Sequence, residues 1–138
     1  MVKISGTYEG DLHCQATHGP SGATLATDAP VDNQGKGEAF SPTDLAATAL
    51  ATCMATIMGI KAQDLGIDLS GMRFEVTKEM APKPPRRLGR LTVTFAMPAT
   101  FDEPTRIKLQ RAAEGCPVHH SLHPDVQVEV DYQWPDAS

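Results

Sequence analysis

The chain has 138 residues, 41% of them hydrophobic, and a net charge of −5 at neutral pH. This length suits a single domain over residues 1–138, which can bury a core without a disulfide or a metal. The acidic balance argues against nucleic acid as a partner, because phosphate binding needs a basic face.

The N-terminal segment Lys3–Thr27 alternates in polarity and is expected to form strands. Turns are expected at Gly10 and at Gly19–Gly22, the second of them closing a hairpin. The segment Asp28–Phe40 is rich in Gly and Asp, shows no periodicity, and predicts a loop.

A long helix is expected to begin at Ser41, which can act as its N-cap. Pro42 suits the first helical position, and Asp44 stands where the acid of a capping box stands. The helix should run to about Asp64, with Gly66 just past its end. Its apolar composition predicts a helix buried on all sides.

Two strands are expected next, Met72–Glu79 and Leu91–Met97. The segment Ala81–Arg87 between them contains three prolines and predicts a protruding loop, because proline cannot donate to a sheet. A helix over Glu103–Glu114 follows, with Asp102 as its N-cap. The chain then has a stop at Gly115, a short helical turn from Pro117, and a last strand over Val126–Tyr132.

The order βββ-α-ββ-α-β predicts an α+β fold with a long buried central helix. One antiparallel sheet can cover only one face of that helix. We therefore expect a partner subunit, in a homodimer, to cover another face.

Compartment and membrane association are judged from the cysteines and the apolar runs. Three widely spaced cysteines do not form a secreted disulfide framework, so we expect a cytoplasmic protein. Met1–Ser5 has no apolar signal core, and no secretory segment is expected. The apolar run Leu45–Ile60 is shorter than the about 20 residues of a membrane span, so no membrane association is expected.

Cys53 and Cys116 are the first candidates for chemistry. Cys53 lies inside the apolar helix, where it could also be a small core residue. Cys116 precedes Pro117 at a helix start, where the helix dipole and a protonated His119 or His120 would lower its pKa. If the two thiols are neighbours, one could react with a peroxide and the other could condense with the resulting sulfenic acid.

Asp44, Arg86 and Arg87 are possible supporting residues. Asp44 lies nine positions before Cys53 (53 − 44 = 9), which places the two on different helix faces and favours a capping role. Arg86 or Arg87 could stabilise a thiolate or a peroxide oxygen, although an ordinary solvated loop explains them equally well. No metal is expected, because no close ligand spacing links the remaining candidates, Cys14, His13, His18, His119, His120 and His123.

Four segments give the chain a resemblance to a known family: Asp28–Pro30, Phe40–Leu45, Ala49–Cys53 and Gly115–His119. The chain resembles the OsmC/Ohr family of peroxide-reducing proteins over nearly its whole length. The resemblance implies an OsmC-like fold in an intertwined homodimer. It also implies that Cys53 attacks the hydroperoxide, that Cys116 resolves it, and that a lipoyl-type dithiol restores the pair without a cofactor.

Two departures separate the chain from classical members, and the shifted acid, Asp44, and the loop segment Pro85–Arg87 resemble the OsmC-like branch of that family. Thr43 stands where classical members carry a glutamate, and no arginine precedes Arg73, whereas classical members carry one in the N-terminal segment. Arg86 or Arg87 could substitute for the missing N-terminal arginine. Neutralising both should then sharply slow Cys53 oxidation, and unchanged kinetics would reject the hypothesis.

The expected function is therefore thiol-dependent reduction of organic hydroperoxides, in oxidative or osmotic stress defence. An apolar pocket is expected to favour organic peroxides, lined by Leu50, Met54, Ile57 and Met58. The alternative is a non-catalytic member that binds a small apolar ligand or senses redox state.

Overall fold

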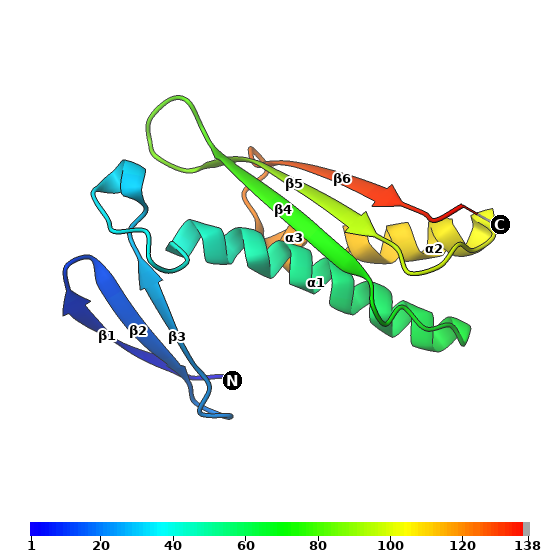
Figure 1. The fold of residues 1–138 in the computed structure, drawn as a ribbon, viewed down its shortest axis with the longest axis horizontal. Helices are drawn as coiled ribbons and strands as arrows, with labels where there is room; N and C mark the ends of the chain where they lie inside the picture. The colour runs from blue at the N-terminus through cyan, green and yellow to red at the C-terminus, as the bar shows by residue number, and fades with distance from the viewer. Residues whose placement is uncertain (137–138) are drawn as a thin grey trace. The chain divides into compact units, whose positions relative to one another are not determined.

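The computed structural model describes residues 1–136, and its contacts gather into two compact units (Figure 1). The first unit is Met1–Ala46, and the second begins at Ala47. A single domain over residues 1–138 remains a prediction.

The first unit contains an antiparallel sheet in the order β1-β2-β3. Its strands are β1 (Ile4–Gly10), β2 (His13–His18) and β3 (Thr24–Asp28), as the alternation predicts. Asp11 and Leu12 join β1 to β2 and both have positive φ, 53° and 62°, which suits the right-handed twist of a two-residue hairpin.

The segment after β3 is a loop with one short 3-10 turn, η1 (Val31–Asn33). Two backbone hydrogen bonds close it, from Gly35 to the Pro30 carbonyl (2.9 Å) and from Gly37 to the Ala29 carbonyl (3.3 Å). A Cβ on Gly35 would lie 1.7 Å from the Ala29 carbonyl oxygen, so this close approach requires glycine.

Helix α1 (Pro42–Leu65) begins with the capping box that the sequence predicts. The Asp44 N–H donates to Ser41 Oγ (3.0 Å), and the Ser41 N–H donates to Asp44 Oδ2 (2.9 Å). Gly66 follows the helix with φ +71°, the conformation in which helices commonly end. Both predicted ends of the helix are confirmed to within a residue or two.

The prediction that α1 is buried on all sides is wrong for the single chain. One stripe at helical spacing is buried, and Ile60 on α1 is 51% exposed. Coverage of the other faces by a second subunit remains a prediction. The buried positions are Ala47, Leu50, Ala51, Met54, Met58 and Ala62.

The length argument against a membrane span is also wrong. Helix α1 has 24 residues and, by length and composition alone, is long and apolar enough to cross a membrane. Core helices of soluble proteins pass the same test. The buried stripe of α1 belongs to a continuous protein core, which is the behaviour of a core helix.

The second unit contains a sheet in the order β4-β5-β6, formed by β4 (Arg73–Met80), β5 (Leu88–Ala96) and β6 (Gln127–Gln133). The expectation of a purely antiparallel sheet is wrong, because β5 and β6 are parallel. Their connection crosses over through α2 (Glu103–Glu114) and α3 (Pro117–Ser121), as parallel strands require.

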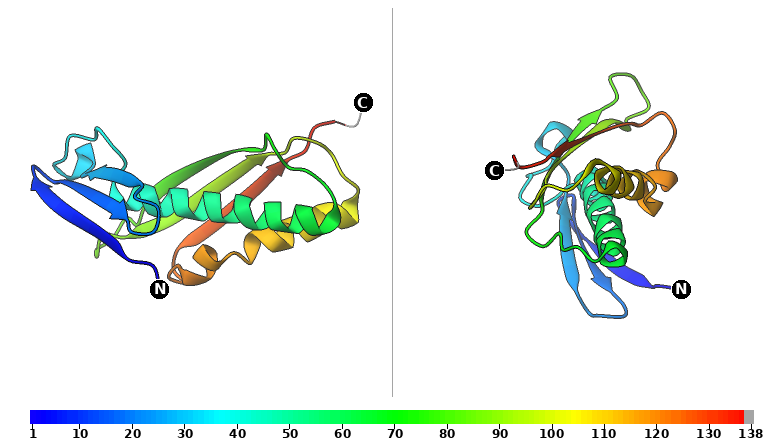
Figure 2. Two further views of the ribbon diagram at one scale, coloured as in Figure 1. Left: turned by 90° about the horizontal axis from the view of Figure 1, so that it is seen from below. Right: turned by 90° about the vertical axis from the view of Figure 1, so that its right-hand side faces the viewer.

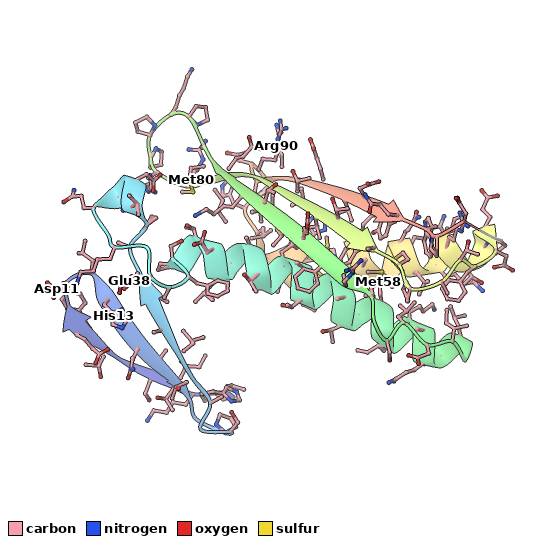
Figure 3. All side chains as sticks on the ribbon, viewed as in Figure 1. Asp11, His13, Glu38, Met58, Met80 and Arg90 are labelled. Atoms are coloured by element: carbon pink, nitrogen blue, oxygen red, sulfur yellow. The ribbon has the colours of Figure 1, made fainter. Side chains whose placement is uncertain are left out.

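Both α1 and α2 lie on one face of this sheet (Figure 2). Leu91, Val93 and Phe95 point from alternate positions of β5 into the core and are fully buried. The face of the sheet that points away from the helices carries polar residues such as Arg90 (Figure 3). On the helix side, Met58 of α1 is fully buried. The core of the second unit therefore lies between the sheet and the two helices.

Candidate functional site

Cys53 lies in the middle of α1 and is partly buried. It packs against the core of the second unit. Small residues such as Ala51 and Ala55 are frequent in this part of the helix. The helix therefore holds this thiol at a fixed point that is still partly open.

Cys116 is the N-cap of α3 and is fully buried. Its Sγ accepts a hydrogen bond from the backbone N–H of His119 (3.4 Å). Pro117 occupies the first turn, where its missing N–H costs nothing.

The fold brings these two cysteines together. They are 63 positions apart in sequence (116 − 53 = 63), yet in the structure the Cys53 thiol lies close enough to Cys116 to raise its pKa. Both are free thiols. Proximity of two free thiols is the first condition for a disulfide to form between them.

The expected lowering of the Cys116 pKa is wrong. Burial raises the pKa of Cys116 above its ordinary value of 9.0, and the neighbouring Cys53 thiol raises it further. The His119 N–H lowers this pKa, but not enough to offset burial. Cys116 is therefore a protonated thiol at neutral pH.

That His119 and His120 supply positive charge to Cys116 remains a prediction. His119 Nδ1 hydrogen-bonds the Glu114 carbonyl oxygen (2.8 Å), so its ring faces the end of α2. The His120 ring stacks on the His119 ring at a centroid distance of 6.4 Å. The contribution of His119 to the Cys116 pKa comes through its backbone N–H.

The possible supporting residues lie in two parts of the fold, Asp44 at the start of α1 and the two arginines in a loop. Asp44 takes part in the capping box with Ser41, which is the capping role favoured by its spacing from Cys53. Arg86 and Arg87 are exposed in the loop between β4 and β5, which has no regular structure. A role for either arginine at the thiols remains a prediction.

The candidate pocket residues are mainly core residues. Leu50, Met54 and Met58 are fully buried, and Ile57 is partly buried. Their role as pocket lining remains a prediction. A hollow of about 370 Å³ runs instead along later turns of α1, lined in part by Thr56, Gly59, Ile60, Gln63, Ile67 and Met72.

Metal ligation has no candidate in the structure. Within residues 1–136, no three or more His, Cys, Asp or Glu side chains group in a way that could hold a metal ion. Cys14 lies exposed on β2.

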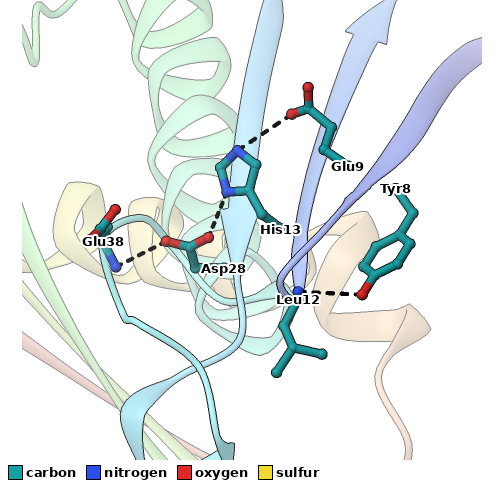
Figure 4. Close-up of polar contacts among 6 residues, drawn as sticks. All are labelled: Tyr8, Glu9, Leu12, His13, Asp28 and Glu38. Atoms are coloured by element: carbon teal, nitrogen blue, oxygen red, sulfur yellow. Dashed lines mark hydrogen bonds and ion pairs between the residues drawn. The ribbon is translucent and has the colours of Figure 1, made fainter.

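A partly buried ion pair in the first unit is absent from the sequence predictions (Figure 4). His13 Nδ1 lies 2.5 Å from Asp28 Oδ1, and His13 Nε2 lies 3.5 Å from Glu9 Oε1. The second Asp28 oxygen accepts the Glu38 N–H (3.0 Å). Glu9 stands at a register shift in β1, and such irregularities re-aim side chains.

These contacts tie the β1–β2 hairpin to the loop that precedes α1. The ion pair borders a hollow of about 340 Å³, lined by Glu9, Gly10, Asp11, His13, Asp28, Lys36 and Glu38. The sequence alone does not reveal this pair, because the two residues are 15 positions apart. His13 and Asp28 become direct partners only through the β2–β3 register.

The His13–Asp28 pair predicts a pH window of stability. The hydrogen bond between the two side chains raises the pKa of His13 above 6.5 and lowers the pKa of Asp28 below 3.8. The histidine contribution is complete below pH 6.5 and is lost as pH rises through the raised pKa. The aspartate contribution is present above pH 3.8 and is lost as pH falls through the lowered pKa.

Asp28→Asn should therefore destabilise the protein more at pH 5.5 than at pH 8.5, as measured by urea unfolding. It should also return the His13 pKa toward 6.5 in an NMR titration. Glu9→Gln is the graded control and should lower this pKa less, because Glu9 acts on His13 more weakly than Asp28 does. An equal cost of Asp28→Asn at both pH values would contradict the prediction.

The family comparison agrees with the fold. The family model described as OsmC-like protein matches residues 35–131. A search of curated proteins found no match. A solved structure from Psychrobacter arcticus 273-4, provisionally named an osmotic stress induced and detoxification response protein, is 48% identical, with a TM-score of 0.91 and 96% of each chain covered.

Two more distant structures share the fold alone. The organic hydroperoxide resistance protein OsmC of Legionella pneumophila is 16% identical, with a TM-score of 0.77 and 96% of each chain covered. An OsmC-like protein of Mycoplasma pneumoniae is 14% identical, with a TM-score of 0.79, covering 99% of this chain and 98% of its own. The matched residues and the 48% identity show that this chain belongs to the OsmC-like protein family.

Proposed function

We propose that the protein is a thiol-dependent peroxidase that reduces organic hydroperoxides through a Cys53–Cys116 disulfide cycle. The observation that carries the proposal is the proximity of the two free thiols, seen in the effect of Cys53 on the pKa of Cys116. Two neighbouring reduced cysteines can pass through a sulfenic acid to a disulfide.

Cys53 is the attacking thiol in this scheme. It is partly open, whereas Cys116 is fully buried and its pKa is raised. The Cys53 sulfur attacks the terminal oxygen of the hydroperoxide, the O–O bond breaks, and the proton of the thiol leaves with the alcohol product. Cys53 is thereby oxidised to a sulfenic acid.

Cys116 completes the cycle as the resolving thiol. Its sulfur bonds to the Cys53 sulfur, the S–O bond breaks, and the hydroxyl leaves as water with the Cys116 proton. A dithiol, of the lipoyl type in our proposal, then reduces the disulfide by exchange and is itself oxidised.

Organic hydroperoxides are the proposed substrates because the helix around Cys53 is apolar. Leu50, Met54, Ile57 and Met58 lie near Cys53 on α1, and no charged residue lies between Leu45 and Ile60. The Legionella relative carries the name of an organic hydroperoxide resistance protein. We place the activity in oxidative or osmotic stress defence, in a cytoplasmic homodimer.

The test is titration of the reduced protein with cumene hydroperoxide, followed by intact mass. One equivalent should remove two hydrogens, and Cys53→Ser should abolish that loss. Hydrogen peroxide should react more slowly than cumene hydroperoxide. An unchanged mass at modest peroxide excess would reject the proposed activity.

A second candidate is a non-catalytic redox sensor or a binder of a small apolar ligand. It is favoured by the capping role of Asp44, the acid closest to the position where classical members carry a glutamate. A sensor would form the disulfide once but show no sustained turnover with a dithiol. A binder would keep saturable ligand binding after Cys53→Ser.

A further inference from the structure

His119 makes two hydrogen bonds near Cys116, one to its sulfur and one to the carbonyl of Glu114. Its backbone N–H donates to Cys116 Sγ (3.4 Å), and its ring nitrogen Nδ1 bonds the Glu114 carbonyl oxygen (2.8 Å). Glu114 is the last residue of α2, so the ring spans from the first turn of α3 back across Gly115 and Cys116.

This span matters because α3 is too short to be stable alone. It has five residues, and isolated helices shorter than about 12 residues are marginal in water. The position of the His119 N–H depends on this short turn. A side-chain bond from His119 to the rigid end of α2 fixes the turn, and with it the donor that faces the Cys116 sulfur.

We propose that His119 is a positioning residue for Cys116, whose ring bond to Glu114 holds the backbone N–H on the resolving sulfur. The inference rests on the proposed function and deepens it. When Cys116 condenses with the Cys53 sulfenic acid, the S–S bond forms, the S–O bond breaks, and the Cys116 proton leaves in water. A fixed N–H donor favours the negative charge that develops on sulfur as its proton departs.

His119→Ala should slow disulfide closure and leave the first oxidation step unchanged. We expect closure to slow by about tenfold, the loss typical of a displaced hydrogen-bond donor to a charged group. Dimedone trapping of the Cys53 sulfenic acid measures the first step, and rapid-quench intact mass measures closure. The sulfenic acid should accumulate in His119→Ala.

Two variants of the same residue separate positioning from general stability. His119→Asn places an amide nitrogen where Nδ1 stands and should restore closure, whereas His119→Gln places it one bond farther and should not. His120→Ala is the matched control, since the His120 ring stacks on the His119 ring but makes no contact that spans Cys116. It should close the disulfide at the wild-type rate.

A second readout does not require peroxidase activity. In Cys53→Ser, the pH titration of Cys116, followed through its ¹³Cβ chemical shift, should move upward by about half a unit in His119→Ala and return in His119→Asn. Unchanged closure and unchanged titration in His119→Ala would overturn the inference, as would His119→Asn behaving like His119→Ala. If the wild type forms no disulfide, the proposed function fails, and the titration alone decides the role of His119.

Discussion

Cys116→Ser is expected to stop the reaction at its first product. One equivalent of cumene hydroperoxide should then add one oxygen to the intact mass, where the wild type loses two hydrogens. Dimedone should trap the oxidised Cys53. Dithiol-supported turnover should fall by about two orders of magnitude, because an intramolecular condensation is replaced by bimolecular reduction of the sulfenic acid.

Cys14→Ser is the matched control for this change. Cys14 is an exposed thiol on β2 of the first unit, and its replacement should leave the mass change and the turnover of the wild type intact. Loss of two hydrogens in Cys116→Ser would contradict the scheme, because another thiol would then be resolving Cys53. Excess peroxide should carry the Cys116→Ser protein on to the irreversible sulfinic acid.

Phe95→Ala should give the largest loss of stability among single core substitutions. Phe95 is fully buried on the central strand β5, and its ring stacks on Tyr132 (5.8 Å) and meets the edge of Phe74 (6.4 Å). Truncating a buried Phe to Ala costs about 3–5 kcal/mol, from lost transfer free energy and from the cavity left behind. Urea unfolding should show this as a lower midpoint with an unchanged slope.

Phe74→Ala is the control with the same chemical change. Phe74 lies opposite Phe95 in the β4–β5 register and is 38% exposed, so its removal leaves a smaller cavity. Its cost should be clearly below that of Phe95→Ala. Equal costs would mean that the ring contact between the two, rather than burial, decides the stability of this layer.

The local elements of the fold could be read from the sequence because their signals are local. Ser41 and Asp44 lie three residues apart and form the predicted capping box. Asp102 likewise caps α2, accepting the Thr105 N–H (3.1 Å). Such contacts join neighbours in sequence, so a pattern of residue types is enough to specify them.

Three of the missed features depend on contacts between distant segments. The parallel β5–β6 pairing follows from a crossover whose direction no residue pattern encodes. The His13–Asp28 pair required the β2–β3 register. The direction of the Cys116 pKa shift depended on burial by the assembled core, which outweighs the favourable helix start visible in the sequence.

The crossover also sets the order in which the chain can assemble its reactive pair. Cys53 is positioned by α1 alone, whereas Cys116 lies in the connection between the parallel strands β5 and β6, which closes only when those strands pair. Long-range closures of this kind are slow steps in folding. The Cys53 and Cys116 thiols are therefore expected to stay apart until β5 and β6 pair, so the rate of disulfide formation under a mild oxidant should report when this connection closes during refolding.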